Sequence, residues 1–314
     1  MESENKAVIC AQGLAKSFRV GFFRKKVEAL RDATFTVKEN EIFGLVGPNG
    51  AGKTTTLKIL TGLMRADAGQ ATLLGRPIGE PMARRNLGYL PEGPYFYDHL
   101  TVVELLDFHG TLCGMHSADR AKRAAELIER VGLGHATDRP IRKFSKGMRQ
   151  RAGLASALMH RPKLVILDEP QSGLDPIGRA EITRLIRGLK DEGSSVFLAS
   201  HILHDVERVC DRIAVMMNGR VVEVGSLDQL LRAQVLEVEI VTDDLPAGLR
   251  EAIEQKGMTW HERVGEGRIR LSGDDPAVAK EVLAMVVQSG ARVRRFQEHR
   301  ERLEDLFVRR AGEG

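Results

Sequence analysis

The sequence Gly47-Pro48-Asn49-Gly50-Ala51-Gly52-Lys53-Thr54 fills every fixed position of the G-x-x-x-x-G-K-S/T phosphate-binding loop. It follows the apolar run Ile42–Val46 and precedes apolar residues at helical spacing, so a strand, a loop and a helix are expected in succession. The glycines let backbone N–H groups point at phosphate oxygens, and the helix N-terminus adds positive potential. A chance glycine turn is the alternative, and the flanking strand and helix argue against it. The sequence therefore predicts a nucleoside-triphosphate site.

Two side chains of the loop have separate predicted tasks. The ammonium of Lys53 reaches the β- and γ-phosphates and takes part in catalysis, and the hydroxyl of Thr54 is a ligand for Mg²⁺. The residues expected to hold the nucleotide through the loop are Gly47, Pro48, Asn49, Gly50, Ala51, Gly52, Lys53, Thr54 and Thr55.

A pair of carboxylates follows a second apolar run, Leu164–Leu167. A buried strand there delivers Asp168 at its carboxyl end, where it can hold Mg²⁺, often through water. Glu169 then lies beside the γ-phosphate and is the expected general base for the attacking water. The alternative is a strand that simply ends in an acidic turn. The catalytic interpretation is favoured because the same chain also carries the phosphate-binding loop.

Composition limits the classes of protein to consider. The 314 residues carry a net charge of +4, which is too small to indicate a nucleic-acid partner. The cysteines Cys10, Cys113 and Cys210 have no C-x-x-C spacing, so neither a disulfide framework nor a zinc site is expected. No apolar run approaches the roughly 18 residues that span a bilayer, so a membrane role requires a separate membrane subunit.

Short apolar runs alternate with helical segments in the first two thirds of the chain. Continuous apolar strands followed by helices favour an α/β fold whose largely parallel sheet is covered on both sides. The helical segments include Arg179–Lys190, which carries apolar residues on one face. The apolar runs are Ala7–Ile9, Ile42–Val46, Leu164–Leu167, Ser195–Ala199 and Ile213–Met217.

Two regions depart from this alternation. Residues 94–140 contain the capping-box spacing Thr101-x-x-Glu104 and a helical run over Ala118–Val131, which indicates a helical insertion. From Val235 onward the pattern becomes strand, helix, two strands, helix and strand, followed by a last helix over Leu303–Arg309. A βαββαβ order is typical of a small ferredoxin-like domain.

Further motifs accompany the phosphate loop and the two carboxylates. Phe144–Arg151 resembles a signature segment in which Leu-Ser-Gly-Gly-Gln is usual, and Ser172–Asp175 resembles a D-loop. His201, just after an apolar strand, matches a switch histidine. Over residues 7 to about 230, the chain resembles the nucleotide-binding subunit of an ABC transporter. Several ordered motifs are far more specific than any one of them.

The resemblance implies a P-loop NTPase (ABC ATPase) core with a mainly parallel sheet and N-terminal antiparallel strands. It implies an ABC ATP-binding domain over residues 1–234, with a helical subdomain at about 94–160. The pattern of residues 235–314 adds a small α+β, ferredoxin-like accessory or regulatory domain.

ATP and Mg²⁺ are the ligands that the resemblance implies. In the family, two copies associate head to tail, and each ATP lies between one phosphate loop and the partner's signature segment. Ser145 and Gly147 precede an expected helix over Arg149–Leu158, so they offer a hydroxyl and N–H groups at a helix N-terminus. Taken alone, Ser145 is an ordinary helix cap. By the resemblance, Asp175 also contacts nucleotide and His201 donates a hydrogen bond to the γ-phosphate.

Two further positions depart from the usual residues of the family. Phe18 stands where an aromatic, more often Tyr, stacks on adenine; a core phenylalanine is the alternative. Glu92 stands where the Q-loop normally supplies Gln, and its carboxylate is expected to approach Mg²⁺ directly or through water. The alternative for Glu92 is an exposed loop glutamate.

The resemblance also implies partners and a location. ATP hydrolysis is expected to drive a separate integral-membrane permease, with this chain cytoplasmic and peripheral on the inner face of the cell membrane. The clustered aromatics Tyr89, Tyr95, Phe96 and Tyr97 suggest a surface that receives a helix of that subunit, or aromatics that anchor the helical insertion. The Phe-Ser-Lys-Gly-Met signature, the Leu-Pro-Glu loop and the short C-terminal domain resemble ATPase subunits of export systems for drugs, antibiotics, lipids, polysaccharides or ions such as sodium.

Two other functions are considered. A non-transport ABC ATPase of translation or DNA repair usually carries tandem cassettes or a long coiled coil, and neither pattern occurs here. A cassette that binds nucleotide without hydrolysing it is disfavoured because Lys53, Asp168, Glu169 and His201 are all present. The transported substrate is a property of the membrane subunit and leaves no pattern in this sequence.

Overall fold

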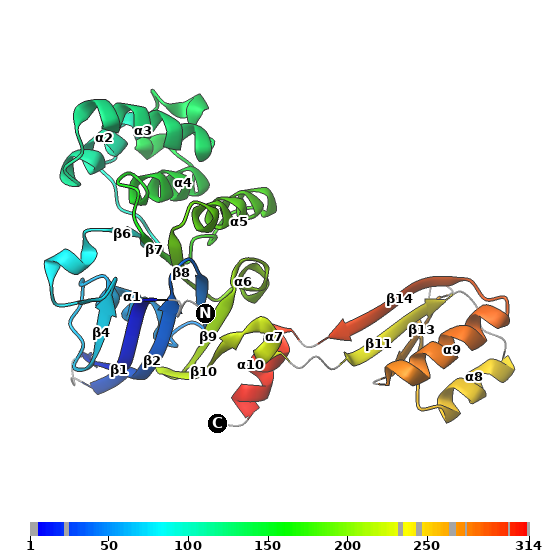
Figure 1. The fold of residues 1–314 in the computed structure, drawn as a ribbon. Coiled ribbons are helices and arrows are strands. Elements are labelled where there is room, and N and C mark those ends of the chain that lie inside the picture. The colour runs from blue at the N-terminus through cyan, green and yellow to red at the C-terminus, as the bar shows by residue number, and fades with distance from the viewer. Residues whose placement is uncertain are drawn as a thin grey trace, which may run out of the picture. The chain divides into compact units, whose positions relative to one another are not determined.

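The computed structural model describes residues 6–21, 25–231, 235–242, 247–263, 268–273, 275–300 and 302–312. The chain divides into two compact units, Met1–Leu227 and Asp228–Gly314 (Figure 1). Among the described residues, no helix is both long and apolar enough to cross a lipid bilayer.

The first unit alternates strands and helices as the apolar runs predict. Its strands are β1 (Ala7–Val20), β2 (Lys25–Lys38), β3 (Ile42–Val46), β4 (Ala68–Leu73), β5 (Arg76–Pro77), β6 (Leu87–Leu90), β7 (Leu164–Asp168), β8 (Ser195–Ser200), β9 (Arg212–Met217) and β10 (Arg220–Ser226). Its helices are α1 (Lys53–Leu60), α2 (Val102–Leu112), α3 (Ser117–Arg130), α4 (Lys146–Ala157), α5 (Pro176–Asp191) and α6 (Leu203–Val209), and α7 (Leu227–Leu230) spans the boundary between the units. Short 3₁₀ helices cover Pro81–Arg84, Gly134–Ala136 and Ile141–Lys143.

Parallel strands form the part of the sheet that carries the site. The strand order is β5-β4-β1-β2-β10-β9-β3-β8-β7-β6, and neighbours from β9 to β6 are parallel. Every residue of β3, β7 and β8 is buried, because their apolar side chains face covered surfaces on both sides. The register pairs Val46 with Ser200 and Asp168 with Ala199. These three strands therefore end at the same edge of the sheet.

Antiparallel strands extend the sheet on the other side. β1 pairs with both β2 and β4 in antiparallel register, and β9 pairs with β10 in the same way. β10 joins β2 through a single parallel pairing, Arg220 with Asp32. The expected N-terminal antiparallel strands are present. Because they are long and β10 adds another antiparallel pair, the complete sheet is mixed rather than mainly parallel.

Helices cover both faces of the parallel strands. Phe43 of β3 packs in one apolar cluster with Leu57 of α1. A Cβ built on the next residue, Gly44, would lie 3.1 Å from Val206 of α6. Successive residues of a strand point to opposite faces, so α1 and α6 lie on opposite faces of the sheet.

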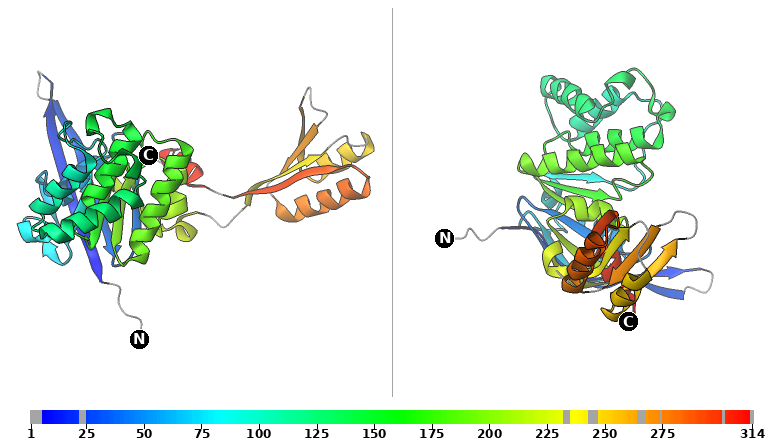
Figure 2. Two further views of the ribbon diagram at one scale, coloured as in Figure 1. Left: turned by 90° about the horizontal axis from the view of Figure 1, so that it is seen from above. Right: turned by 90° about the vertical axis from the view of Figure 1, so that its right-hand side faces the viewer.

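The predicted helical insertion is present as α2, α3 and α4, which gather beyond β6 and β7 (Figures 1 and 2). The capping box of α2 is confirmed: Thr101 N donates to Glu104 Oε2 at 2.8 Å, and Glu104 N donates to Thr101 Oγ1 at 3.2 Å. The expected start of α4 at Arg149 is wrong. The helix begins at Lys146 because Ser145 caps it, so Gly147 lies in the first turn.

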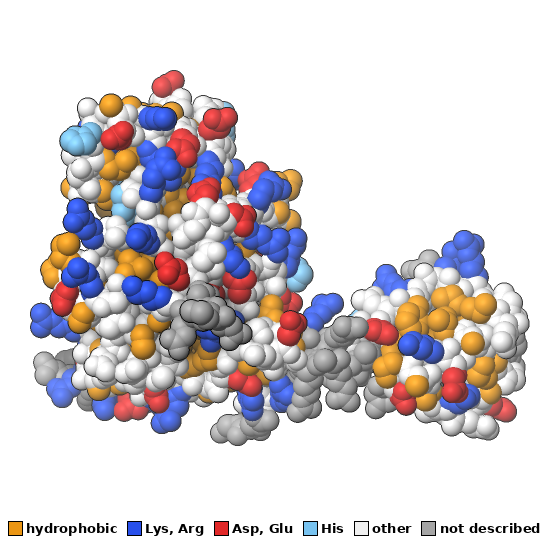
Figure 3. All heavy atoms as spheres, in the orientation of Figure 1, with side chains coloured by type: hydrophobic (Ala, Val, Ile, Leu, Met, Phe, Trp, Pro, Cys, Tyr) orange, Lys and Arg blue, Asp and Glu red, His pale blue; other side chains and the backbone are white. Residues whose placement is uncertain are grey.

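Charged side chains of both signs are interspersed over the face of the first unit in Figure 3. The composition has 47 basic and 43 acidic residues, a nearly balanced set. Many of them form local pairs, such as Arg120 with Asp107 at 2.6 Å and Lys190 with Asp211 at 2.6 Å. Exposed pairs of this kind contribute little to stability and mainly keep the surface polar.

The second unit is a four-stranded antiparallel sheet with helices packed on it. Val238 and Ile240 of β11 share an apolar cluster with Ile253 of α8 and with Val282 and Val286 of α9. The strand order is β12-β13-β11-β14. The elements are β11 (Val235–Thr242), α8 (Ala247–Gln255), β12 (Thr259–Arg263), β13 (Arg268–Gly273), α9 (Pro276–Gln288), β14 (Val293–Arg300) and α10 (Leu303–Gly312). This is the βαββαβ order that the sequence pattern indicates, followed by a last helix.

Candidate active site

The phosphate loop connects the end of β3 to the start of α1. Gly52 caps α1 with φ +111°, a left-handed angle that favours glycine. A Cβ on Gly47 would lie 2.3 Å from the carbonyl oxygen of Met216, so only glycine fits against β9 there. Pro48, Asn49 and Gly50 are exposed, whereas Thr54 and Thr55 are half-buried at the start of the helix. The backbone of the loop is therefore constrained by its glycines, while its residues 48–50 are exposed directly before the N-terminus of α1.

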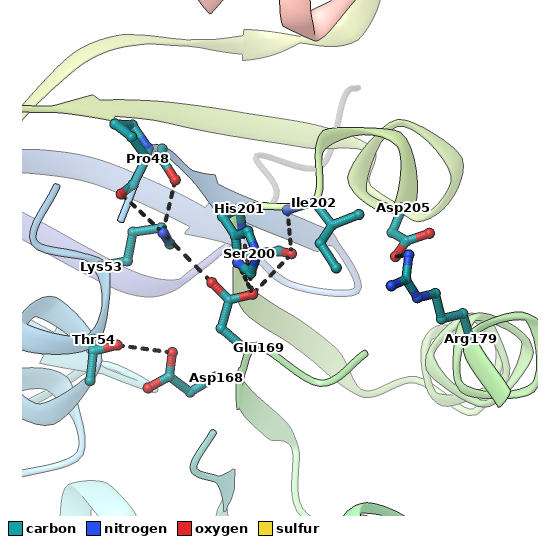
Figure 4. Close-up of polar contacts among 11 residues, drawn as sticks. Pro48, Lys53, Thr54, Asp168, Glu169, Arg179, Ser200, His201, Ile202 and Asp205 are labelled. Atoms are coloured by element: carbon teal, nitrogen blue, oxygen red, sulfur yellow. Dashed lines mark hydrogen bonds and ion pairs between the residues drawn. The ribbon is translucent and has the colours of Figure 1, made fainter. Parts of the chain in front are cut away.

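Lys53 points back across this loop (Figure 4). Its Nζ donates to the carbonyl oxygens of Gly47 at 2.8 Å and Pro48 at 3.3 Å. The same ammonium lies 3.6 Å from Oε1 of Glu169, and both side chains are 6% exposed. A buried cation held against the phosphate loop is suited to binding anionic oxygens.

Thr54 and Asp168 form the second contact between the loop and the sheet edge. Thr54 Oγ1 donates to Asp168 Oδ1 at 3.3 Å. Burial raises the pKa of the Asp168 carboxyl to about 6; the hydrogen bond from Thr54 opposes this, and the negative charges of Glu169 and Glu92 add to it. A buried carboxylate beside a hydroxyl is a pair of hard oxygen ligands that favours a cation.

Thr54 and Asp168 suit a Mg²⁺ ion that shares its coordination with water and phosphate, and not a metal ion held by protein ligands alone. Among the described residues, no group of three or more His, Cys, Asp or Glu side chains could hold a metal ion. Mg²⁺ usually takes only one or two protein ligands and completes its octahedron with water and phosphate oxygens. Thr54 and Asp168 supply that number and chemistry.

Glu169 is held between two strands at the site. Its backbone has φ +48°, in the left-handed region, directly after β7 ends. Its Oε2 lies 2.9 Å from Nδ1 of His201 and accepts hydrogen bonds from Ser200 Oγ and His201 N, each at 3.3 Å. Oε1 faces Lys53. The carboxylate thus has one oxygen fixed by the end of β8 and the other directed toward the phosphate loop.

Ser200 is a contact that the sequence patterns do not indicate. Its hydroxyl donates to Glu169 Oε2 and accepts from Ile202 N at 3.1 Å, so it links the carboxylate to the turn that carries His201. Its position at the end of β8 is the only signal in the sequence, and a serine at a strand end is too common to be informative alone.

Phe18 and Glu92 are both placed outside the core. Phe18 lies on β1 opposite Val27 of β2, is half-buried, and has Lys16 Nζ 6.0 Å from its ring centroid. It is absent from the buried side chains, so the core alternative does not hold. Glu92 is exposed after β6, and its charge raises the pKa of Asp168. Its exposure is compatible both with an approach to Mg²⁺ and with the alternative of an exposed loop glutamate.

The signature and D-loop residues form a separate surface. Ser145 caps α4 by accepting from Met148 N at 3.3 Å, and Asp175 caps α5 by accepting from Gly178 N at 2.8 Å. Both are exposed. A Cβ on Gly147 would lie 3.1 Å from Leu174 Cδ2, so the two segments are adjacent. Within the described part of the chain, no hydrogen bond or ion pair joins Ser145 or Asp175 to the cluster around Lys53 and Glu169.

Comparison with known proteins identifies the family of the chain. The ABC transporter family model matches residues 30–172. The Bacillus subtilis ABC transporter ATP-binding protein YxlF is 37% identical over 305 residues, 96% of this chain and 99% of the relative. This chain belongs to the ABC transporter family. It is the ATP-binding subunit of an ABC transporter, with the ATPase activity that the family implies, as the sequence predicts.

Other relatives extend the comparison. The bacitracin transport ATP-binding protein BcrA of Bacillus licheniformis is 34% identical over 281 residues, 88% of this chain and 90% of the relative. An ABC transporter ATP-binding protein of Synechocystis is 48% identical over 221 residues, 69% of this chain; the match spans 62% of that relative's length. A solved ATP-binding cassette dimer in a post-hydrolysis state, bound to ADP and Pi, has a TM-score of 0.65 over 70% of this chain and 98% of that one, at 22% identity. That solved cassette binds ADP and Pi and is a dimer, and its likeness to this chain is one of fold.

Proposed function

We propose that this chain hydrolyses ATP·Mg²⁺ with Glu169 as general base, to drive export through a separate membrane subunit. The observation that carries the proposal is the position of the Glu169 carboxylate, held by His201 on one side and facing Lys53 on the other. A positioned carboxylate beside the γ-phosphate takes a proton from the attacking water. His201 donates to the γ-phosphate and orients Glu169. Lys53 neutralises the β- and γ-phosphate charge.

Thr54 and Asp168 would hold Mg²⁺, and Glu92 would reach it directly or through water. The ion supplies neutralisation of the charge that develops on the phosphate oxygens. Phe18 supports the adenine ring from β1, because its half-buried ring leaves a face available for stacking. The N–H groups of residues 47–55 surround the phosphates.

A second copy of the chain completes each site in this proposal. Ser145, Gly147 and Asp175 lie at or beside the N-termini of α4 and α5, where N–H groups favour anions, yet they make no contact with the described cluster around Lys53 in their own chain. In a head-to-tail dimer they meet the nucleotide of the partner. The solved cassette dimer with ADP and Pi supports this arrangement by fold.

A crosslinking experiment tests the dimer. The chain carries Glu169→Gln to retain ATP, Cys10→Ser and Cys113→Ser to remove thiols, and new cysteines at Asn49→Cys and Ser145→Cys. We expect a bifunctional thiol reagent to link two chains with ATP·Mg²⁺ and not without nucleotide. A control pair, Asn49→Cys with Glu192→Cys, is expected to stay unlinked. Absence of an ATP-dependent link at the first pair would contradict the proposal.

A membrane subunit is proposed to dock beside β6. A cleft of about 330 Å³ there is lined by Tyr89, Pro91, Phe96 and His109 among others, with Tyr95 at its rim 94% exposed. Burial raises the pKa of Tyr89 to about 12 and lowers the pKa of His109, so both groups are neutral at physiological pH. An uncharged cleft with an exposed aromatic rim suits a helix of a permease. This interaction would place the chain on the cytoplasmic face of the membrane.

Export is proposed because of similarity to the bacitracin transport ATP-binding protein. We propose an ABC domain over residues 1–234 and a ferredoxin-like accessory domain over 235–314. The order β12-β13-β11-β14 with α8 and α9 packed on the sheet supports the latter. Copurification from membranes tests the transport role: a bound integral-membrane protein is expected, and recovery with ribosomes or DNA instead would favour the non-transport alternative.

A further inference from the structure

Arg179, on the first turn of α5, contacts two segments that flank the catalytic carboxylate. Its Nε donates to the carbonyl oxygen of Leu174 at 3.2 Å, within the segment Ser172–Asp175. Its guanidinium NH1 group lies 3.9 Å from Oδ2 of Asp205 on α6, the helix that begins just after His201 (Figure 4). A single guanidinium therefore bridges the D-loop segment and the helix that follows the switch histidine.

The backbone around Arg179 is itself tied to the residues after Glu169. The Gln171 side chain is buried, and its Nε2 donates to the carbonyl oxygen of Arg179 at 3.2 Å and to Thr183 Oγ1 at 2.7 Å. Ser172 N donates to the carbonyl oxygen of Glu169 at 3.0 Å. Hydrogen bonds thus connect the start of α5 to the turn that carries the Glu169 carboxylate.

Asp205 is incompletely paired in this arrangement. Its side chain is 9% exposed, and its Oδ2 accepts no hydrogen bond from any described residue. At 3.9 Å, the Arg179 contact is an ion pair too long for a hydrogen bond. Buried carboxylates are normally both paired and hydrogen-bonded. The Arg179 side chain is 38% exposed and therefore has room to shift toward Asp205.

We propose that Arg179 is a positioning residue for ATP hydrolysis, which closes on Asp205 when nucleotide and the partner protomer engage the D-loop. Closure would join the segment at Leu174 to the helix at Asp205. That contact keeps His201 and Glu169 in their positions relative to each other. Binding of nucleotide and of the partner protomer at the D-loop thereby affects the two residues proposed to act in hydrolysis. The inference rests on the proposed roles of Glu169 and His201. It assigns to Arg179 an effect on the rate of hydrolysis and none on nucleotide binding.

Steady-state ATPase assays on the full chain test this assignment. We expect Arg179→Met to lower kcat about tenfold, with KM for ATP unchanged. Arg179→Lys keeps the charge that faces Asp205 and loses the donation to Leu174, so it restores part of the loss. Asp205→Asn lowers kcat by a similar factor, and the double variant with Arg179→Met is no slower than either single variant, because both changes break one link.

Arg187 provides a matched control on the same helix. It donates from its guanidinium to the carbonyl oxygen of Arg208, so it also ties α5 to α6, but at the end of α6 away from His201. Arg187→Met is expected to keep kcat. Hydrogen exchange with ATP·Mg²⁺ bound gives a second readout: the amides of the Ser172–Asp175 segment and of His201 exchange faster in Arg179→Met and Asp205→Asn, and not in Arg187→Met.

The outcomes separate this inference from the proposed function. Normal kcat in folded Arg179→Met and Asp205→Asn, with Glu169→Gln inactive, overturns the inference alone. An equal loss in Arg187→Met also overturns it, since any α5–α6 link would then serve. If Glu169→Gln turns over ATP at the normal rate, the proposed role of Glu169 as general base is wrong, and the inference that rests on it is wrong as well. If thermal melting shows that Arg179→Met is unstable, kcat of Arg179→Lys is compared with kcat of Arg187→Met. A lower kcat in Arg179→Lys supports the inference, and equal values overturn it.

Discussion

The ammonium of Lys53 lies 3.6 Å from Oε1 of Glu169, with both side chains 6% exposed. The same ammonium donates to two carbonyl oxygens of the phosphate loop. A γ-phosphate that enters the loop offers this cation a second anionic partner. One ammonium thus contacts both the phosphate loop and the Glu169 carboxylate. We expect substitution of Lys53 to affect mainly ATP binding and substitution of Glu169 to affect mainly hydrolysis.

Glu169→Gln should slow ATP turnover by roughly 10²–10⁴, the usual contribution of a positioned base. ATP affinity should not fall, because glutamine has a similar shape and removes a negative charge close to the phosphates. Single-turnover hydrolysis and equilibrium nucleotide binding measure the two effects. Glu192→Gln, a change at a surface residue paired with Arg130, is the control and should match the unmodified chain. Near-normal hydrolysis in Glu169→Gln would remove it from the role of base.

Lys53→Met should weaken ATP binding by about 10- to 100-fold, since charge-assisted hydrogen bonds each contribute about 1.5–3 kcal/mol. Lys58→Met, an exposed lysine on the same helix α1, serves as the control because it changes the net charge equally. Titration of a fluorescent ATP analogue measures both variants. Equal weakening in the two would show that general charge, and not the position of Lys53, governs binding.

The sequence predicts the strand ends of the candidate site because β3, β7 and β8 are buried on both faces. Their apolar runs are continuous, so the polar residues that follow, such as Thr54, Glu169 and His201, stand out. β2 has no such run: four of its 14 residues are buried, and exposed residues, several of them charged, separate them. β10 likewise alternates exposed and half-buried residues and has a single buried one. These antiparallel strands depend on pairing with distant neighbours, which a local pattern does not record.

Contacts set by register and packing are also invisible in the sequence. Ser200 reaches Glu169 only because β7 and β8 are adjacent and Asp168 pairs with Ala199. The bridge from Arg179 to Asp205 depends on how α5 packs against α6. The sequence pattern predicts the start of α4 at Arg149 instead of Lys146, because Gly147 has low helix propensity and obscures the first turn. Cap geometry at Ser145 decides that boundary.

Gly47→Ala should destabilise the first unit by about 1–3 kcal/mol, the range for overpacking a filled site. Its added methyl would approach the backbone carbonyl of Met216 to 2.3 Å, and a backbone atom of a central strand cannot move aside cheaply. Urea denaturation measures the change in the free energy of unfolding. Gly79→Ala has no atom within 4 Å of the added Cβ and no left-handed φ, so it should be nearly neutral. Equal stability of the two variants would contradict the close approach.

Phe18→Ala should weaken ATP binding by a factor corresponding to about 1–3 kcal/mol, the contribution of base stacking on an aromatic ring. The ring is half-buried on β1, so it can present one face while β2 supports it. Phe18→Tyr keeps the face and should bind ATP normally. Phe108→Ala removes another partly exposed phenylalanine, on α2, and should leave ATP affinity unchanged.

Binding of inorganic triphosphate separates stacking from a general distortion of the loop. Triphosphate has no base, so Phe18→Ala should bind it as tightly as the unmodified chain while binding ATP more weakly. Competition against a fluorescent nucleotide measures both ligands in each variant. If triphosphate affinity falls as far as ATP affinity, the ring supports the phosphate loop rather than the adenine. If only ATP affinity falls, the ring stacks on the adenine, and the departure from the usual tyrosine has no consequence for recognition of the base, because stacking requires the π face and not the hydroxyl.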